Sequence, residues 1–172
     1  MSQQFPIIWL TGNSGAGKTT LAESIRQYFR EHPTAPFLLP YPLVLDGDEM
    51  RETISRDEGF SPEDRRKHNL RIARLAKLFQ SHGFLVIVAV IAPFECVRRE
   101  IDVLCDPRWI YVKRSGLESQ DCPYEEPESP DLVINNDILS IEDARIQLLA
   151  YLLPCAHAHR ESVCVVSHSG TP

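Results

Sequence analysis

The sequence predicts an α/β fold of three layers, in which helices cover both faces of a central parallel sheet. Three observations lead to this prediction. Strand-like and helix-like patterns alternate along the 172 residues, as they do in parallel sheets with right-handed crossovers. The unbroken apolar run over residues 84–92 suits a central parallel strand that is covered on both faces. A glycine-rich segment, residues 12–19, connects the first strand pattern to the first helix pattern.

Strands are expected in five places. The first is the apolar run Pro6–Leu10, and the longest is the run over residues 84–92. Short strands are expected at residues 43–45, 109–112 and 132–134. Because helical patterns separate these runs, the strands are expected to pair in parallel.

Helical patterns fill the intervals, at residues 19–31, 48–55, 62–82, 94–104 and 140–152. The third of these helices has the clearest beginning. Ser61 is a favourable N-cap, Pro62 suits the first helical position, and two acidic residues follow in the first turn. The polar or proline-rich stretches at 31–42 and 113–130 are expected to form loops.

Composition indicates one folded domain of ordinary globular type. Apolar residues make up 43% and charged residues 24% of the chain. We expect this domain to cover residues 1–154 and residues 155–172 to form a poorly ordered C-terminal tail. The net charge of −6 argues against a nucleic-acid-binding surface, and five cysteines without a C-x-x-C pair fit a cytoplasmic protein. No signal peptide or membrane span is apparent.

The segment Gly12–Thr19 reads G-x-x-x-x-G-K-T, the pattern of a phosphate-binding loop between a strand and a helix. Its glycines allow backbone N–H groups to surround a phosphate, and the following helix adds partial positive charge. Lys18 is expected to reach the β- and γ-phosphates and Thr19 to bind Mg²⁺. The predicted fold is therefore of the P-loop NTPase type. The expected ATP-binding residues are Gly12, Asn13, Ser14, Gly15, Ala16, Gly17, Lys18, Thr19 and Thr20.

Two acidic residues, Asp46 and Asp48, follow the second strand. Phosphoryl transfer requires Mg²⁺ and a carboxylate that orients or deprotonates the attacking hydroxyl. We expect Asp48 to be the catalytic base or the Mg²⁺-linked acid, acting with Lys18 and Thr19, and Asp46 to support it on the acceptor side. The alternative is that both carboxylates only cap the short helix that follows.

An apolar stripe runs along the helix at 62–82 and consists of Ile72, Leu75, Ala76 and Phe79. Toward the helix N-terminus the same face becomes polar and basic, at Asn69, His68 and Arg65. That end of the helix lies at the carboxyl ends of the strands, where ligands bind in such folds. The three residues are therefore expected to contact an anionic or nucleotide-like acceptor, with a structural role as the alternative for each.

Two aromatic residues lie next to the expected site. Phe60 precedes the helix at 62–82, and Phe94 follows the run at 84–92. Each is expected either to pack against the start of the helix that follows or to stack on a base of the acceptor.

Five short motifs occur in a specific order: Ile8–Gly12, Leu45–Asp48, Gly59–Arg65, Ala76–Phe79 and Pro123–Pro127. With the phosphate-binding loop, this set resembles the adenylylsulfate (APS) kinases over residues 6–153. The resemblance implies Mg²⁺-dependent transfer of the ATP γ-phosphate to the 3′-hydroxyl of APS, which gives PAPS and ADP. It also allows a homodimer.

The resemblance assigns roles to individual residues. It makes Asp48 the catalytic acid near Mg²⁺. It implies that Arg51, Arg65 and Phe60 hold the APS nucleotide and that Phe94 stacks near its adenine. Arg114 would retain an ATP contact, and the segment 123–125 would close the lid back onto the site.

The sequence also departs from the family pattern. Only residues 113–122 stand where the family has a long basic lid. His68 replaces an acceptor-contacting Asn, Leu70 an Arg, Ser55 an Asn and Ala92 a Ser. These changes lie on the acceptor side, so an alternative is a kinase for another nucleotide-linked acceptor, such as a CDP- or UDP-linked phosphoramidate or sugar. A non-catalytic nucleotide-binding domain is a third hypothesis, against which the intact phosphate-loop residues argue.

Overall fold

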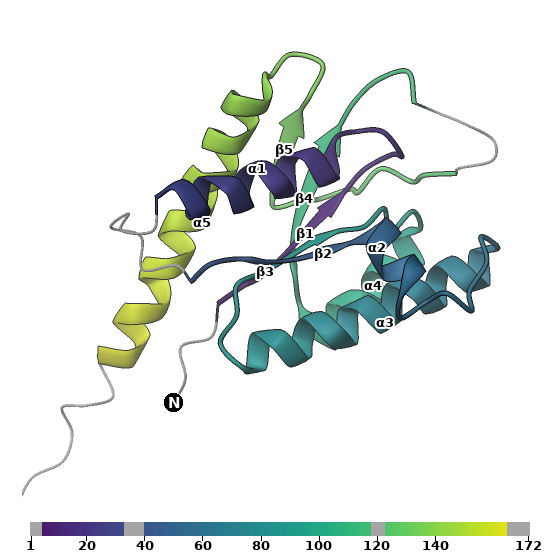
Figure 1. The fold of residues 1–172 in the computed structure, drawn as a ribbon, viewed down its shortest axis with the longest axis horizontal. Helices are drawn as coiled ribbons and strands as arrows, with labels where there is room; N and C mark the ends of the chain where they lie inside the picture. Colours follow the sequence, from purple (N-terminus) through teal and green to yellow (C-terminus); the bar gives the residue numbers. More distant parts are fainter. Residues whose placement is uncertain (1–4, 33–39, 118–122, 165–172) are drawn as a thin grey trace, which may run out of the picture.

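The computed structural model describes residues 5–32, 40–117 and 123–164, and the side chains of this part up to Leu152. Within these ranges the chain forms five strands and five helices (Figure 1). In chain order they are β1 (Ile7–Thr11), α1 (Lys18–Glu31), β2 (Leu43–Asp46), α2 (Gly47–Glu52), α3 (Pro62–Ser81), β3 (Val86–Ala89), α4 (Glu95–Cys105), β4 (Arg108–Lys113), β5 (Leu132–Asn135) and α5 (Ile141–Cys164). All five strands were predicted from the sequence.

The strands form one parallel sheet in the order β2-β3-β1-β4-β5. The apolar run at 84–92 is an internal strand, but the middle strand is β1, and only Val86–Ala89 pair regularly. The prediction of a central strand over the whole run is therefore wrong in extent and position. The run leaves the sheet early because the carbonyl groups of Val90 and Ile91 bond to side chains of β1 instead of to a neighbouring strand.

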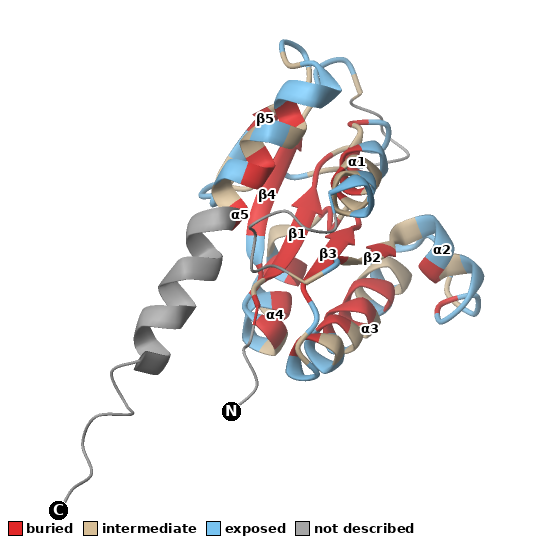
Figure 2. Ribbon diagram, turned by 60° about the vertical axis from the view of Figure 1, so that its left-hand side comes forward, coloured by how far each residue is buried: buried red, intermediate tan, exposed pale blue. Residues whose placement is uncertain are grey.

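Helices cover both faces of the sheet, which confirms the three-layer prediction. Figure 1 shows α1 and α5 on one side and α3 and α4 on the other, and Figure 2 shows the buried strands between them. Side chains of β1 alternate between the two layers: Ile8 and Leu10 pack with α1, whereas Ile7 and Trp9 pack with α3 and α4. We call these two sides the α1 face and the α3 face.

Helix α3 buries a broader stripe than the sequence predicted. Ile72 and Ala76 are fully buried, whereas Leu75 and Phe79 are only partly buried against the same cluster. The buried stripe continues to the N-terminal half of the helix through the polar residue Asn69. The predicted change of this face from apolar to polar is therefore present in the structure.

Helix α5 differs most from its prediction. It was expected to end at residue 152, before Pro154, but it continues to Cys164. Residues 155–164 of the expected tail thus belong to the helix. Residues 165–172 of the expected tail lie outside the described residues, as do 33–39 and 118–122 of the two expected loops.

The carboxyl ends of β2, β3 and β1 lie side by side, because these strands are consecutive in the sheet. The chain leaves them through the start of α2, the segment before α4, and the glycine-rich loop before α1. In open parallel sheets, ligands bind at this edge. Within the described ranges, none of the helices combines the length and apolar character that a membrane span requires.

Candidate active site

A cleft of about 240 Å³ lies at the carboxyl edge of the sheet. It brings together the phosphate-binding loop, the start of α2, the N-terminal half of α3 and the segment after β3. The residues that line it are Ser14, Gly15, Lys18, Thr19, Asp46, Gly47, Asp48, Arg51, Phe60, Arg65, His68, Asn69, Ala89, Val90, Ile91, Ala92 and Pro93. Eleven of these were named from the sequence as site residues.

Two glycines of the phosphate-binding loop are required by its geometry. Gly12 and Gly17 both have positive φ, at 149° and 100°. A Cβ atom on Gly12 would lie 2.3 Å from the carbonyl oxygen of Val112, and one on Gly17 would lie 2.8 Å from Nδ2 of Asn136. Any larger residue would therefore push the loop away from β4 or from the loop after β5.

Asn136 supports the phosphate-binding loop from outside the cleft. Its Nδ2 donates a hydrogen bond to the carbonyl oxygen of Ala16 at 2.7 Å. Its own backbone N–H donates to the carbonyl oxygen of Lys113, which fixes it to the end of β4. Asn136 was not predicted from the sequence, because nothing in the local pattern shows that the loop after β5 returns to the glycines.

Lys18 is buried and folded back onto its own loop. Its Nζ donates to the carbonyl oxygens of Gly12 at 2.8 Å and of Asn13 at 2.6 Å. Burial lowers the pKa of the Lys18 ammonium to about 8, although Asp46 and Asp48 act in the opposite direction. The lysine therefore remains charged at neutral pH, and the hydrogen bonds of its ammonium group among the described residues go to carbonyl oxygens.

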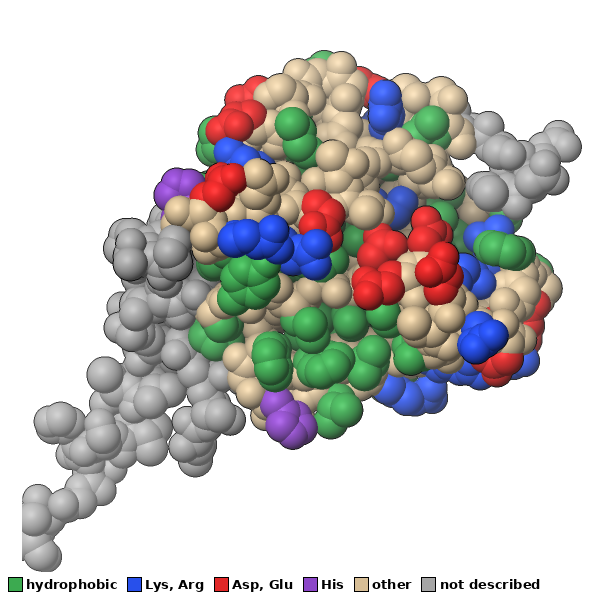
Figure 3. All heavy atoms as spheres, in the orientation of Figure 1, with side chains coloured by type: hydrophobic (Ala, Val, Ile, Leu, Met, Phe, Trp, Pro, Cys, Tyr) green, Lys and Arg blue, Asp and Glu red, His purple; other side chains and the backbone are tan. Residues whose placement is uncertain are grey.

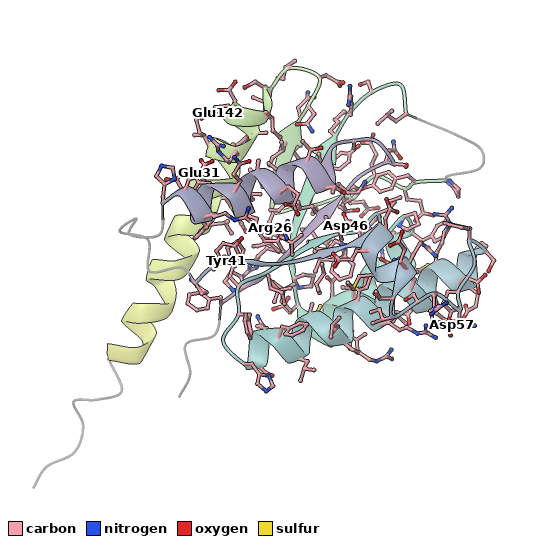
Figure 4. The ribbon with its side chains drawn as sticks, in the orientation of Figure 1. Arg26, Glu31, Tyr41, Asp46, Asp57 and Glu142 are labelled. Carbon is pink, nitrogen blue, oxygen red and sulfur yellow. The ribbon has the colours of Figure 1, made fainter. Side chains whose placement is uncertain are left out.

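Thr19 and Asp46 form a direct link between the phosphate-binding loop and β2. The Thr19 hydroxyl donates to Oδ2 of Asp46 at 2.6 Å. The other carboxylate oxygen of Asp46 caps α2 by accepting from the N–H groups of Asp48 and Glu49. Figure 4 shows Asp46 at this junction of β2 and α2. Asp46 therefore does cap α2, which was the alternative to a role at the site. It also contacts Thr19, the threonine expected to bind Mg²⁺.

Asp48 lies in the first turn of α2 and lines the cleft. Among the described residues its carboxylate has no hydrogen-bond partner, in contrast to that of Asp46. Figure 3 shows acidic side chains gathered on the surface over α2. Asp48 is therefore the carboxylate at this edge that is available to a ligand.

Oxygen donors of this kind suit Mg²⁺. A hydroxyl and two carboxylates are hard ligands, and Mg²⁺ in kinase sites is usually held by one or two carboxylates together with substrate phosphates. The described residues contain no group of three or more acidic, histidine or cysteine side chains arranged around one metal position. The donor set thus fits a metal that arrives with a nucleotide.

Two arginines enclose an exposed aromatic ring at the outer end of the cleft. Phe60 is 68% exposed. The guanidinium carbons of Arg51 and Arg65 lie 4.4 Å and 5.5 Å from the centre of its ring. Arg51 donates to the carbonyl oxygen of Gly59 and Arg65 to that of Phe60, and neither has a carboxylate within 4.0 Å among the described residues.

The surroundings of the Arg51 guanidinium disfavour its positive charge. Desolvation and the nearby Arg65 lower the pKa of Arg51, while Asp48 and other acids oppose this shift. Two neighbouring cations that form no ion pair with a carboxylate among the described residues favour an anionic ligand between them. This end of the cleft is therefore suited to a phosphate or sulfate group next to a ring that can stack on Phe60.

His68 and Asn69 form the buried wall beneath these arginines. Each is 2% exposed. Asn69 donates through Nδ2 to the carbonyl oxygen of Arg65 at 2.8 Å, while its Oδ1 and the Nδ1 of His68 have no partner among the described residues. Burial and the cations Arg51, Arg71 and Arg65 lower the pKa of His68 to about 4, so the imidazole is neutral at physiological pH.

Several predicted site residues do not line the cleft. Phe94 is the N-cap residue of α4 and packs against the cluster of the α3 face. Arg114 donates to the carbonyl oxygen of Gly15 at 3.4 Å, outside the cleft lining. The remaining members belong to the phosphate-binding loop or to the start of α1: Gly12, Asn13, Ala16, Gly17 and Thr20.

The wall of the cleft formed by the end of β3 and the segment after it was not predicted from the sequence. Ala89, the last residue of β3, and residues 90–93 after it all line the cleft. Their apolar composition indicated only a buried strand. The usable signal was topological, since they stand at the carboxyl end of a strand in a parallel sheet.

The comparisons show similarity to adenylyl-sulfate kinases. A family model described as adenylylsulphate kinase matches residues 4–113. An adenylyl-sulfate kinase from Bacillus pumilus is 37% identical, covering 85% of this chain and 84% of that relative. The structure of a Mycobacterium tuberculosis APS kinase in complex with AMPPNP and APS superposes with a TM-score of 0.72, at 26% identity over 88% of this chain and 98% of that chain. A hexameric APS kinase from Thiobacillus denitrificans has a TM-score of 0.70 and 30% identity, covering 88% of this chain and 29% of that chain.

Proposed function

The chain belongs to the adenylyl-sulfate kinase family, and we propose that it transfers the γ-phosphate of ATP to the 3′-hydroxyl of APS. In this reaction the acceptor oxygen forms a bond to the γ-phosphorus. The bond from that phosphorus to the oxygen bridging the β-phosphate breaks, and the hydroxyl proton is released. The products are PAPS and ADP.

The main support for this proposal is the position of one residue cluster. The Arg51–Phe60–Arg65 cluster lies in the same cleft as the phosphate-binding loop. An exposed ring flanked by two cations without carboxylate partners offers stacking to a nucleobase and charge to an anionic linkage. APS contains both parts: an adenine base and a sulfate joined to a phosphate.

The remaining cleft residues supply the phosphoryl-transfer chemistry. Lys18 and the N–H groups of the loop would hold the β- and γ-phosphates of ATP. Thr19, with Asp46 and Asp48 beside it, would hold Mg²⁺, which neutralises charge on the phosphates when it is bound. Asp48 would accept the hydrogen bond of the acceptor hydroxyl and orient it toward the γ-phosphate, because its carboxylate is not engaged within the protein.

The test is ADP release by the purified chain with Mg-ATP and a panel of acceptors. The panel contains APS, AMP, and CDP- and UDP-linked sugars and phosphoramidates. We expect strong stimulation by APS and recovery of PAPS. If ATP binds but APS does not stimulate turnover, the proposal is wrong, and stimulation by another panel member would identify the acceptor instead.

A further inference from the structure

The segment that follows β3 is fixed by hydrogen bonds to four successive carbonyl groups. Each carbonyl accepts from a different residue, and the donors come from β1, from α4 and from the segment that follows residue 122. The pairs are Trp9 Nε1 to Val90, Thr11 Oγ1 to Ile91, Arg98 Nη1 to Ala92 and the Glu125 backbone N–H to Pro93. This segment lines the cleft, so these bonds determine the shape of one wall.

The wall contains a strained residue. Ala92 has a φ of 45°, in the left-handed region that non-glycine residues rarely occupy. Its carbonyl oxygen accepts from Arg98 at 2.9 Å, and the Arg98 side chain is almost fully buried. A conformation of this kind persists only when the surrounding contacts enforce it, so the donors around this segment hold it in place.

Tyr124 acts on the wall through Thr11. The Thr11 hydroxyl donates its hydrogen to the carbonyl oxygen of Ile91, which can only accept. The Tyr124 hydroxyl, 3.0 Å from Thr11 Oγ1, must therefore be the donor in that contact. The Tyr124 ring stacks on Tyr111 with centroids 6.1 Å apart and lies under the Arg98 guanidinium. Burial raises the pKa of Tyr124 to about 12, so the hydroxyl keeps its proton.

Glu125 holds the same wall at its far end. Its backbone N–H donates to the carbonyl oxygen of Pro93 at 2.8 Å, and its carboxylate accepts from the N–H of Glu95 at 2.6 Å. Glu95 is the first residue of α4, whose N-cap residue, Phe94, provides no side-chain cap. Glu125 therefore supplies the missing cap from 30 residues away along the chain.

The wall belongs to the acceptor half of the cleft. Val90 and Ala92 pack in the cluster of the α3 face, together with Leu70 of the helix that carries Arg65 and His68. Helix α1, which follows the phosphate-binding loop, packs on the opposite face. A shift of this wall would therefore alter the space next to the acceptor residues before it altered the phosphate-binding loop.

We propose that Tyr124 and Glu125 are positioning residues that hold the segment 90–95 in the conformation required to bind the acceptor. This inference rests on the proposed function for the identity of the acceptor. Neither side chain lines the cleft. Tyr124 acts through Thr11, whose hydroxyl bonds the Ile91 carbonyl, and Glu125 acts through the α4 N-terminus that its carboxylate caps.

The test compares Tyr124→Phe and Glu125→Gln with the wild-type chain. Glu128→Gln is the matched control, because it removes the same charge from an exposed position in the same segment. For each variant, kcat and KM for APS are measured, together with the Kd for Mg-ATP. Amide hydrogen exchange is measured over residues 90–97 and 12–18, because it reports on both halves of the cleft without any acceptor.

We expect each variant to raise KM for APS about tenfold, because Tyr124→Phe removes a hydrogen-bond donor and Glu125→Gln removes the negative charge that caps α4. The Kd for Mg-ATP should stay within about twofold. Exchange should accelerate over 90–97 and remain unchanged over 12–18. Unchanged KM and exchange in both variants would overturn the proposal, as would equal weakening of APS and ATP binding. If the wild-type chain does not use APS, the proposed function fails, and the exchange comparison still decides whether this segment is held by Tyr124 and Glu125.

Discussion

Lys18 is a buried charge in this cleft that lowers the stability of the folded chain. A buried ammonium with a lowered pKa destabilises the folded chain, because the unfolded chain binds the proton more tightly. The penalty is fully present below pH 8 and is relieved as the pH rises from about 8 toward 10.5. Bound phosphates would supply the missing counter-charge.

We therefore predict that Lys18→Met stabilises the ligand-free chain at pH 7, by an amount on the order of 1–3 kcal/mol. The same variant should lose the thermal stabilisation that Mg-ATP gives to the wild-type chain. Thermal melts at pH 7.0 and 9.5, with and without Mg-ATP, measure both effects. The stability difference should shrink at pH 9.5, and a variant that melts below the wild type at pH 7 would contradict this account.

Substitutions of Asp46 and Asp48 should have different effects on catalysis and on Mg-ATP binding. Asp48 is not engaged within the described protein, so Asp48→Asn should lower kcat by about 100-fold or more while Kd for Mg-ATP changes little. Asp46 bonds Thr19 and caps α2, so Asp46→Asn should weaken Mg-ATP binding and also lower thermal stability. Steady-state kinetics and calorimetry distinguish the two patterns, and a fully active Asp48 variant would remove that residue from the mechanism.

His68 should make the chain sensitive to acid. Its pKa is about 4 in the folded chain and about 6.5 in the unfolded chain, so the unfolded state binds more protons between these values. Stability should therefore fall as the pH drops from 6.5 to 4. We expect His68→Asn to lose part of this dependence in urea unfolding at pH 7.0, 5.5 and 4.5. His82→Asn, at an exposed histidine at the end of α3, is the control that should retain it.

At the scale of elements, the phosphate-binding loop depends on a residue far away in sequence. Asn136 holds the carbonyl of Ala16 and fills the space that Gly17 leaves open. We predict that Asn136→Ala weakens Mg-ATP binding about 5–10-fold, as expected for one net hydrogen bond, and leaves KM for APS within about twofold. A larger effect on APS than on ATP would show that the two halves of the cleft are not separable in this way.

Elements with strong local signals could be predicted from the sequence. The strand–glycine–helix order located the phosphate-binding loop, and Ser61-Pro62 located the start of α3, where the Ser61 hydroxyl does accept from the N–H of Asp64. The length of β3 could not be predicted, because the bonds that end it come from Trp9 and Thr11 of another strand. Helix α5 passes through Pro154, where the local rule predicted an end.

In the candidate site, too, local features could be predicted from the sequence, whereas contacts between distant segments could not. Arg65, His68 and Asn69 could be placed in the cleft from helical periodicity, because one face of one helix carries all three. The Thr19–Asp46 contact, the support by Asn136 and the wall after β3 depend on contacts between distant segments. No spacing rule within a single element encodes such contacts.

At the scale of the whole molecule, the two faces of the sheet lie next to different parts of the cleft. The α1 face is continuous with the phosphate-binding loop, and the α3 face carries the residues proposed to bind the acceptor and the wall after β3. The departures from the family pattern at Ser55, His68 and Leu70 lie on the acceptor half, where Ser55 and His68 each hold a buried polar atom without a partner among the described residues. These changes are where acceptor specificity would be altered.

The domain limits and the assembly state of the chain also remain predictions at this scale. We expect residues 1–154 to contain the kinase domain, so a chain that lacks 165–172 should keep its melting temperature and ATP binding. Light scattering during size-exclusion chromatography tests the homodimer that the family resemblance allows.

The most direct test of the central claim is identification of the phosphorylated product. The purified chain is incubated with Mg²⁺, APS and ATP labelled with ¹⁸O in the γ-phosphate, and the product is analysed by mass spectrometry and by treatment with a 3′-specific nucleotidase. We predict a product that carries the labelled phosphate and loses it to the 3′-nucleotidase, in amounts equal to the ADP formed. Labelled phosphate found only in water-derived inorganic phosphate, or on an acceptor other than APS, would contradict the account.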